Sequence, residues 1–184
     1  PEIEITLATR NLLMAHIGPF VELNNPLFIH ESAQLHGKVW IGKDVSVWAN
    51  VVTRCEQFEI FIDEGSNIQD FVMIHEGIQT PTRVGRNCSI THHVTLHGCK
   101  IGDNCLIGIN ATVMDGADIG ANSIVAGHAI VSEGSVFPEN SVIGGVPAKL
   151  IAERDNSEAN SANALYYRKL AAIYADGKDR IEES

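Results

Sequence analysis

The feature that most constrains this chain is a repeat of six residues. From position 101 onward an aliphatic or aromatic residue falls at every sixth position: Ile101, Ile107, Val113, Ile119, Val125, Val131, Phe137 and Ile143. The same step occurs at Ile29, Leu35, Ile41 and Val47, at Ile62, Ile68 and Ile74, and at Val84, Ile90 and Leu96. An α-helix repeats every 3.6 residues and a half-buried strand every two, so neither explains the pattern. A very short strand followed by a turn does explain it.

Three such strands per coil close a triangular prism, with the aliphatic residue of each hexapeptide facing the axis and coils stacked about 4.8 Å apart. A glycine often follows the aliphatic residue, and we expect it to adopt a backbone conformation closed to other residues. The sequence therefore predicts an all-β solenoid, a parallel β-helix of hexapeptide repeats. Residues 29–151 would make six to seven coils.

The ends of the chain depart from the repeat. We assign residues 1–28 to an N-terminal strand and loop lead-in, 29–151 to the β-helix, and 152–184 to a C-terminal α-helix packing on it. Asn156 or Ser157 is the expected helix cap and Gly177 the expected terminator. Its expected apolar face, at helical spacing, comprises Ala162, Leu165, Tyr166, Leu170, Ile173 and Tyr174, with Ala159, Ala164, Ala171 and Ala172.

Composition narrows the partners and the compartment. The 13 basic and 23 acidic residues give a net charge of −10, which argues against nucleic acid and against anionic membranes. No apolar run approaches the ~18 residues that cross a bilayer, and the amino end does not resemble a signal peptide. The four cysteines form no CxxC pair, so we expect a reduced, cytoplasmic protein.

Two histidines fall on one edge of the predicted prism. His75 directly follows Ile74 and His97 directly follows Leu96, so both hold the second place of a hexapeptide. They are 22 residues apart, and the segment HEGIQTPTR between them is four residues too long, which leaves one full coil. Residues one coil apart start about 4.8 Å from each other, close enough for two imidazoles to bind one metal ion.

The other histidines are less informative. His92 lies one face away, so a third ligand would come from another copy of the chain, since triangular solenoids often form homotrimers. Chance stacking is the competing interpretation, because His30 and His36 hold the same hexapeptide place on adjacent faces. His93 and His128 hold the fourth place of a hexapeptide, where we expect surface residues.

The phrases SNIQDFVMIH and THHVTLHGCKIGDNCLIG resemble the γ-class carbonic anhydrases of the bacterial hexapeptide-repeat superfamily, over about residues 22 to 150. The resemblance implies a left-handed coil. It also implies that His75, His92 and His97 bind zinc, or iron or cobalt in its place, with His92 donated by the neighbouring subunit of a homotrimer. Three histidines leave a fourth position open for water, the pattern of a catalytic zinc.

The same resemblance implies a lyase that hydrates carbon dioxide to bicarbonate. Zinc lowers the pKa of its bound water to about 7, a value known from a carbonic anhydrase of another class. Gln69 matches a glutamine that hydrogen-bonds the resulting hydroxide. Arg54 and Asp70 match residues that pair across the subunit boundary, with Glu56 in place of an aspartate, and their role is either assembly or catalysis.

A tyrosine of the C-terminal helix approaches the metal in several relatives, and Tyr167 matches it best, with Tyr166 as second candidate. Two departures from the family bear on turnover. Gln57 replaces a glutamate, and the acidic loop after the first histidine ligand is here the short EGIQTPTR, whose one carboxylate is Glu76. Both features serve proton export in the family, so we expect slow turnover.

Three other functions stay open from the sequence. The same scaffold with a GGVPAK ending occurs in acyl-CoA-dependent acyltransferases, in which His93 or His128 would act as the base. A zinc-assisted thioesterase is the second alternative. The third is a scaffold whose metal only ties the trimer together.

Overall fold

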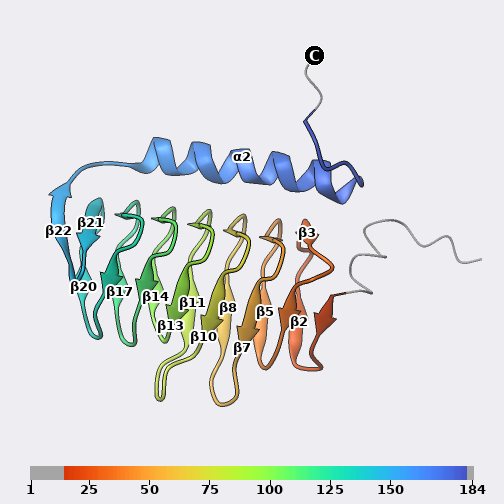
Figure 1. Ribbon diagram of the computed structural model, residues 1–184, viewed down its shortest axis with the longest axis horizontal. Coiled ribbons are helices and arrows are strands. Elements are labelled where there is room, and N and C mark those ends of the chain that lie inside the picture. The colour runs from red at the N-terminus through yellow and green to blue at the C-terminus, as the bar shows by residue number, and fades with distance from the viewer. Residues whose placement is uncertain (1–14, 182–184) are drawn as a thin grey trace, which may run out of the picture.

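Most hexapeptides form a strand of two or three residues and a turn, in the computed structural model, which describes residues 15–181. Successive strands add to three parallel sheets in rotation, so the chain winds as a solenoid of about seven coils (Figure 1). The predicted all-β solenoid is thereby confirmed.

The strands divide among the sheets as follows. Sheet A contains β1 (His16–Ile17), β4 (Gln34–Leu35), β7 (Val52–Arg54), β10 (Met73–His75), β13 (Thr95–His97), β16 (Thr112–Val113) and β19 (Ile130–Val131). Sheet B contains β2 (Val21–Leu23), β5 (Val39–Ile41), β8 (Ile60–Ile62), β11 (Thr82–Val84), β14 (Lys100–Ile101), β17 (Asp118–Ile119) and β20 (Val136–Phe137). Sheet C contains β3 (Phe28–Ile29), β6 (Ser46–Val47), β9 (Asn67–Ile68), β12 (Ser89–Ile90), β15 (Leu106–Ile107), β18 (Ile124–Val125), β21 (Ser141–Gly145) and β22 (Ala148–Glu153), the last pairing antiparallel.

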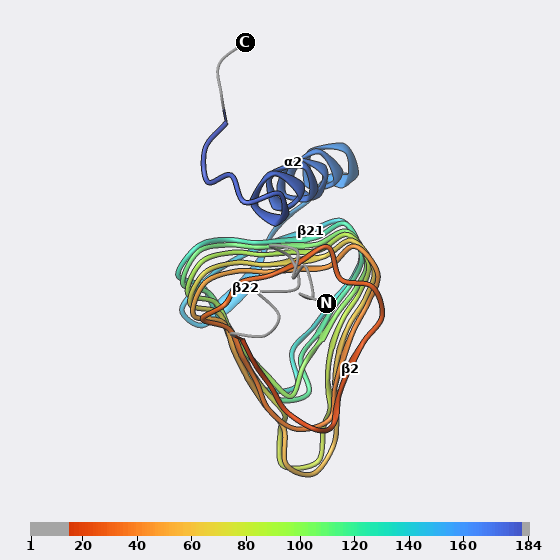
Figure 2. The same cartoon turned by 90° about the vertical axis from the view of Figure 1, so that its right-hand side faces the viewer.

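The cross-section is a triangle, and its three edges are named here by the sheets that meet there (Figure 2). Along the chain, the AB edge comes directly after each strand of sheet A, the BC edge after each strand of sheet B, and the CA edge after each strand of sheet C. Residues 55–59 and 76–81 make longer connections at the AB edge than the two residues that follow β13, and they protrude as the lower corner of Figure 2.

The core is the row of aliphatic residues that the six-residue repeat predicts. Ile41, Ile68, Ile74, Leu96 and Ile107 are fully buried along the axis. Burial of each such side chain contributes about 1.5–3 kcal/mol, and stacking places each one on its counterpart in the next coil. All four cysteines are free and buried, as expected of small apolar fillers.

The glycines that follow the aliphatic residues are needed because there is no room for a side chain, and not because of their backbone conformation. A Cβ on Gly102 would lie 2.7 Å from the amide nitrogen of Ala121, and one on Gly120 would lie 2.5 Å from the carbonyl carbon of Pro138. Neither glycine has a positive φ, which corrects the expectation from the sequence. The left-handed conformation falls instead on corner residues such as Asn104 (φ 56°) and Asn122 (φ 57°).

The coil begins earlier than residue 29. Strands β1 and β2 already pair with β4 and β5, so His16 belongs to the first coil instead of preceding the repeat. The signal was present, because Ile17 and Leu23 continue the six-residue series back from Ile29. Residues 1–14 of the expected lead-in and residues 182–184 lie outside the described part of the chain.

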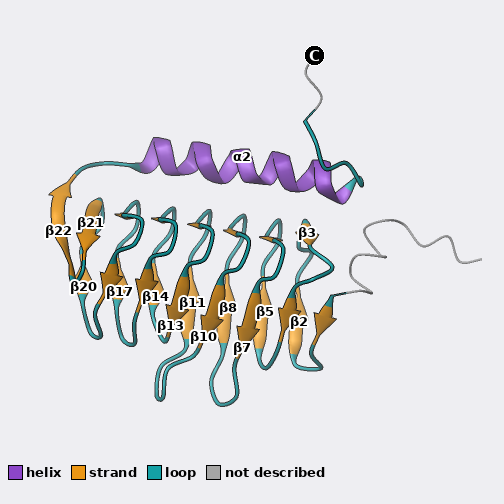
Figure 3. Ribbon diagram, in the orientation of Figure 1, coloured by secondary structure: helices purple, strands orange, loops and turns teal. Residues whose placement is uncertain are grey.

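Helix α2 (Ser157–Ala175) lies along sheet C, as Figures 1 and 3 show, which confirms that a C-terminal helix returns along the prism. Asn156 is the capping residue but its side chain makes no cap hydrogen bond, and Asp155 instead accepts from the Ser157 amide at 2.9 Å. No helix within residues 15–181 is long and apolar enough to cross a membrane.

The expected apolar face of α2 is correct in part. Ala164 and Ala171 are buried and Leu170 and Tyr174 pack against the apolar cluster under the helix, but Leu165 and Tyr166 are about half exposed, and Asn160 is buried instead. Small and amide side chains lie underneath because the helix rests close to the backbone of the BC edge. The Asn160 amide donates to the carbonyls of Asn104 (2.9 Å) and Ser123 (3.2 Å).

Candidate metal centre

His75 and His97 meet at the AB edge. They are register partners at the ends of β10 and β13, as counting residues predicted. His75 Nδ1 lies 3.0 Å from His97 Nε2, and the ring centres are 4.9 Å apart. Both side chains are partly buried and line a hollow of about 550 Å³ with Glu56, Gln57 and Ile78.

Each imidazole also contacts a carboxylate through its other nitrogen. His75 Nε2 lies 3.1 Å from Glu56 Oε2, and His97 Nδ1 contacts Asp115 Oδ1. A carboxylate accepts hydrogen bonds, so the proton of each neutral ring belongs on the nitrogen that faces its carboxylate. Each of the two nitrogens that face one another then carries a lone pair and no proton.

Two facing lone pairs repel unless a cation lies between or beside them. Two imidazole nitrogens on one tetrahedral zinc, each about 2.0–2.1 Å from the ion, are about 3.3 Å apart. The 3.0 Å separation of His75 Nδ1 and His97 Nε2 is close to that value. The donor set therefore fits a divalent metal with imidazole ligands.

Arg54 and Glu56 belong to the same edge. Arg54 is the register partner of His75 in β7, and its guanidinium contacts the Glu56 carboxylate. Desolvation alone would raise the pKa of Glu56, but hydrogen bonds from Arg54 and His75 outweigh it and hold the pKa below its usual value. Glu56 is thus ionised beside His75.

Glu76 has a different orientation from the one expected of a proton-export group. Its carboxylate is buried and accepts from the backbone amides of Glu56 (2.8 Å), Gln57 (2.6 Å) and Phe58. The Cys55 thiol donates to it at 3.2 Å. Desolvation would raise the pKa of Glu76, and these hydrogen bonds lower it further than burial raises it. Glu76 therefore ties the 55–59 connection to the end of β10.

A second group of predicted site residues lies at the CA edge. His92 Nδ1 is 3.1 Å from Asp70 Oδ2, and both side chains are more than a third exposed. Gln69 is buried, and its amide donates to Asn67 Oδ1 at 2.9 Å. Tyr167 packs edge-on against Trp48, which directly follows β6 toward the same edge, with ring centres 5.8 Å apart. Burial raises the pKa of Tyr167, and the charge of Asp70 raises it further.

The CA edge also carries two strained aromatic residues. Phe71 (φ 62°) and His93 (φ 60°) adopt the left-handed conformation and stack with ring centres 4.8 Å apart. A phenylalanine in that conformation costs about 1–2 kcal/mol, and Phe71 is 53% exposed, so burial within the protomer does not offset the cost.

The two groups lie at opposite ends of the sheet A strands. His92 is five residues before His97, or about 16 Å of extended chain. Within residues 15–181, no three His, Cys, Asp or Glu side chains of this chain converge as a metal site. The structure thus brings together His75, His97, Arg54 and Glu56, and separates them from the CA edge.

Asp115 is the site residue that sequence reasoning missed. Counting alone does not give this pair, because Leu96 and Ile101 are five residues apart and the offset from β13 to β16 is 17 residues, which makes Met114 the counterpart of His97 and puts Asp115 one residue further on. Attention to histidines alone passed over it.

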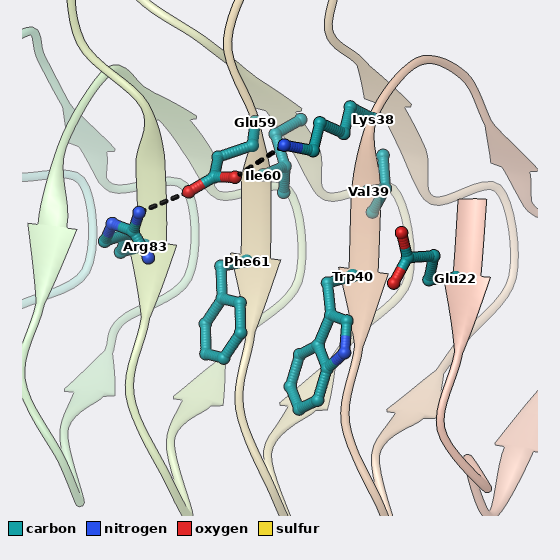
Figure 4. Close-up of a pocket in the computed structure, with 8 residues that line it drawn as sticks. All are labelled: Glu22, Lys38, Val39, Trp40, Glu59, Ile60, Phe61 and Arg83. Carbon is teal, nitrogen blue, oxygen red and sulfur yellow. Dashed lines mark hydrogen bonds and ion pairs between the residues drawn. The ribbon is translucent and has the colours of Figure 1, made fainter. Parts of the chain in front are cut away.

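A separate hollow of about 320 Å³ lies on the outer face of sheet B (Figure 4). Trp40 and Phe61 stack with ring centres 4.2 Å apart, and the Arg83 guanidinium lies 5.8 Å from the Phe61 ring centre. Glu59 joins Arg83 to Lys38, as the dashed lines show. The stacked rings and the Glu59 ion pairs join neighbouring coils, so this ladder contributes to the stability of the solenoid.

Known proteins resemble this chain over most of its length. The family described as bacterial transferase hexapeptide (six repeats) matches residues 98–133. The "Probable carbonic anhydrase" of Methanocaldococcus jannaschii is 48% identical over 145 residues, covering 78% of this chain and 91% of that protein. "Gamma carbonic anhydrase 2, mitochondrial" of Arabidopsis thaliana is 32% identical over 189 aligned positions, covering 98% of this chain and 68% of that protein. A solved hexapeptide transferase family protein from Anaplasma phagocytophilum has a TM-score of 0.78 at 28% identity, covering 84% of this chain and 92% of that one.

Proposed function

This chain belongs to the γ-carbonic anhydrase family of left-handed hexapeptide-repeat proteins, and from that premise we propose that it is a zinc enzyme that hydrates carbon dioxide to bicarbonate. His75 and His97 of one subunit and His92 of the next would hold the metal in a homotrimer. The reaction site would then lie between subunits.

The observation that carries the proposal is the pair of facing imidazole nitrogens, 3.0 Å apart, at the AB edge. Glu56 and Asp115 accept from the outer nitrogens of these rings, so the inner nitrogens are free to bind a cation. Neutral imidazoles are ligands that zinc prefers, and carboxylates on their far nitrogens are the usual supporting partners.

A trimer would complete the ligand set. The outward row at the start of the described sheet A strands has no Asp, Glu, Lys or Arg: His16, Gln34, Val52, Met73, Thr95, Thr112 and Ile130. If sheet A surrounds a threefold axis, the CA edge of each copy meets the AB edge of the next. The exposed His92 and Asp70 would then face His75, His97 and Arg54 of another subunit.

A metal held there would supply Lewis acidity that makes water ionise near neutral pH. Around it, Gln69 of the second subunit would orient the reacting oxygen through its amide, and Arg54 would pair with Asp70 across the boundary as well as with Glu56. Tyr167 would approach from the second subunit, because it lies near Asp70.

Proton removal would be the weak step. Glu76 faces inward, Glu56 and Asp115 are each paired with an imidazole, and Gln57 cannot ionise. No carboxylate that lines the hollow beside His75 and His97 in the described chain is therefore left to pass protons to solvent. Turnover would be slow and would rise with a small buffer base.

The first test measures metal and activity together. Protein purified without chelator is analysed for zinc, iron and cobalt, and carbon dioxide hydration is followed by stopped flow with and without imidazole. We expect about one ion per chain and a hydration rate that imidazole raises. His36→Ala is the matched control and should keep both metal and activity, since His36 directly follows β4 of sheet A at the AB edge. Protein that takes up no divalent ion, or loaded protein without hydration, contradicts the proposal.

A zinc-assisted thioesterase is the second candidate, and one observation favours it. A larger hollow of about 730 Å³ adjoins the site through Glu56 and Gln57 and is lined by Phe20 and Phe58. Such an apolar groove exceeds what carbon dioxide needs. Hydrolysis of a short acyl-CoA by loaded protein that does not hydrate carbon dioxide would favour this candidate. The acyltransferase has less support, because neither His93 nor His128 contacts a carboxylate within residues 15–181.

A further inference from the structure

We propose that Asp115 is a positioning residue that fixes the tautomer of His97, with the proton on Nδ1 and the lone pair on Nε2. Asp115 lies on the turn after β16, and the register of β13 with β16 brings that turn beside Gly98. Its Oδ1 contacts His97 Nδ1, while His97 Nε2 points to His75 Nδ1 at 3.0 Å. The inference depends on the proposed function only in the test that measures zinc binding.

The carboxylate is enclosed by backbone that has no room for larger residues. A Cβ on Gly98 would lie 2.7 Å from Asp115 Oδ1, and one on Gly77 would lie 2.9 Å from the same atom. Gly98 also has a positive φ of 55°. Two coils therefore leave space at this point for one side chain, and Asp115 fills it.

The loop 76–81 covers the same carboxylate. The hydroxyl of Thr80 is buried, lacks a hydrogen-bond partner within the described residues, and lies against both glycines. The Asp115 side chain is 28% exposed, so its contact with His97 is only partly screened by water. A partly desolvated carboxylate orients an imidazole more firmly than an exposed one.

The chemical type of the side chain at position 115, carboxylate or amide, decides which tautomer His97 adopts. A carboxylate can only accept, so its partner nitrogen must carry the proton. An amide at position 115 has nearly the same shape but can donate or accept, so it would allow His97 to hold its proton on either nitrogen. Asp115→Asn therefore changes the selection of the tautomer with little change in packing.

The first measurement uses the metal-free protein and no activity. With ¹⁵N-histidine labelling at pH 8.5, the nitrogen shifts of His97 report which nitrogen carries the proton, and His97→Gln assigns the signal. We expect Nδ1–H in the natural protein and a mixture in Asp115→Asn. His97 found as Nε2–H in the natural protein overturns the inference without need of any variant.

The second measurement uses zinc alone, by chelator competition. Asp115→Asn is expected to weaken zinc binding about 10–100-fold. Asp118→Asn, three residues on and paired with Lys100 at 2.9 Å, is the matched control and should change neither readout. An unchanged tautomer and affinity in folded Asp115→Asn refute the positioning role. If the natural protein binds no zinc, the proposed function fails, and the tautomer measurement still decides the role of Asp115.

Discussion

At the residue scale, counting along the repeat placed side chains well but did not orient them. The register of His75 with His97 followed from subtracting an insertion, whereas the next coil is one residue short, so the same count leads to Met114 and misses Asp115. Glu76 could not be oriented in that way. Its side chain turns inward because three backbone amides of the 55–59 connection need an acceptor, and no periodicity encodes that need.

Replacement of Glu76 by glutamine tests this anchoring role. The amide keeps the shape but turns an NH₂ group toward backbone donors, so at least one buried N–H loses its acceptor. We expect Glu76→Gln to lower the free energy of unfolding by about 2 kcal/mol in urea titrations. Glu133→Gln, on an exposed turn, is the control and should stay within about 0.5 kcal/mol. Equal stability of the two variants would mean that the loop is held by other contacts.

The cysteines offer a second prediction at this scale. Burial, with the neighbouring Glu76, raises the pKa of Cys55 to about 12, and burial raises the pKa of Cys99 to about 12. Both thiols are therefore almost wholly protonated at pH 8, and the thiolate is the reactive form. We expect a disulfide reagent at pH 8 to label neither thiol in the folded protein and both in urea. Fast labelling of Cys55 in the folded state would contradict its contact with Glu76.

At the element scale, the solenoid could be predicted because one rule acts in every coil, whereas the face of α2 could be predicted only in part. Each hexapeptide buries its aliphatic residue on the coil below, so the period is written many times in the sequence. The helix docks only once, and the BC edge beneath it presents asparagine backbone rather than an apolar groove. Asn160 therefore lies underneath while Leu165 and Tyr166 face outward. Apolar spacing alone places Leu170, Ala171 and Tyr174 correctly against the cluster of Phe28 and Trp48, but it misplaces Leu165 and Tyr166.

Asn160→Ala tests how the helix is docked. Asn160 is 2% exposed and its amide donates to the carbonyls of Asn104 and Ser123, so alanine removes both bonds and leaves Ser123 with the Leu106 amide as its donor and Asn104 without this one. We expect a loss of about 2–3 kcal/mol in the free energy of unfolding, measured by thermal or chemical denaturation. Lys169→Ala, on the exposed side of α2, should be nearly neutral. A neutral Asn160→Ala would show that aromatic packing of Tyr167 and Tyr174 on Trp48 suffices to hold the helix.

At the scale of the whole molecule, one protomer would carry two incomplete halves of the proposed site. The AB edge has two imidazoles with facing lone pairs, and the CA edge has a third imidazole beside Asp70. His92 lies before β13 and His97 at its end, and the described residues of one chain bring no third such ligand to the pair. A ring of identical copies would unite the two edges without any change in the protomer.

Complementation between two defective variants tests this division. His92→Ala spoils only the CA edge and His97→Ala only the AB edge, so neither homotrimer should retain a complete site. In a mixed trimer, one boundary joins the intact AB edge of the first variant to the intact CA edge of the second. We expect each variant alone to bind zinc weakly, and mixed trimers to recover about one tight zinc each, measured by titration after separation of differently tagged species. Because each chain lacks a ligand, a site within a single chain could not be restored by mixing. Mixed trimers that bind no more zinc than the parents would therefore leave the cross-subunit site without support.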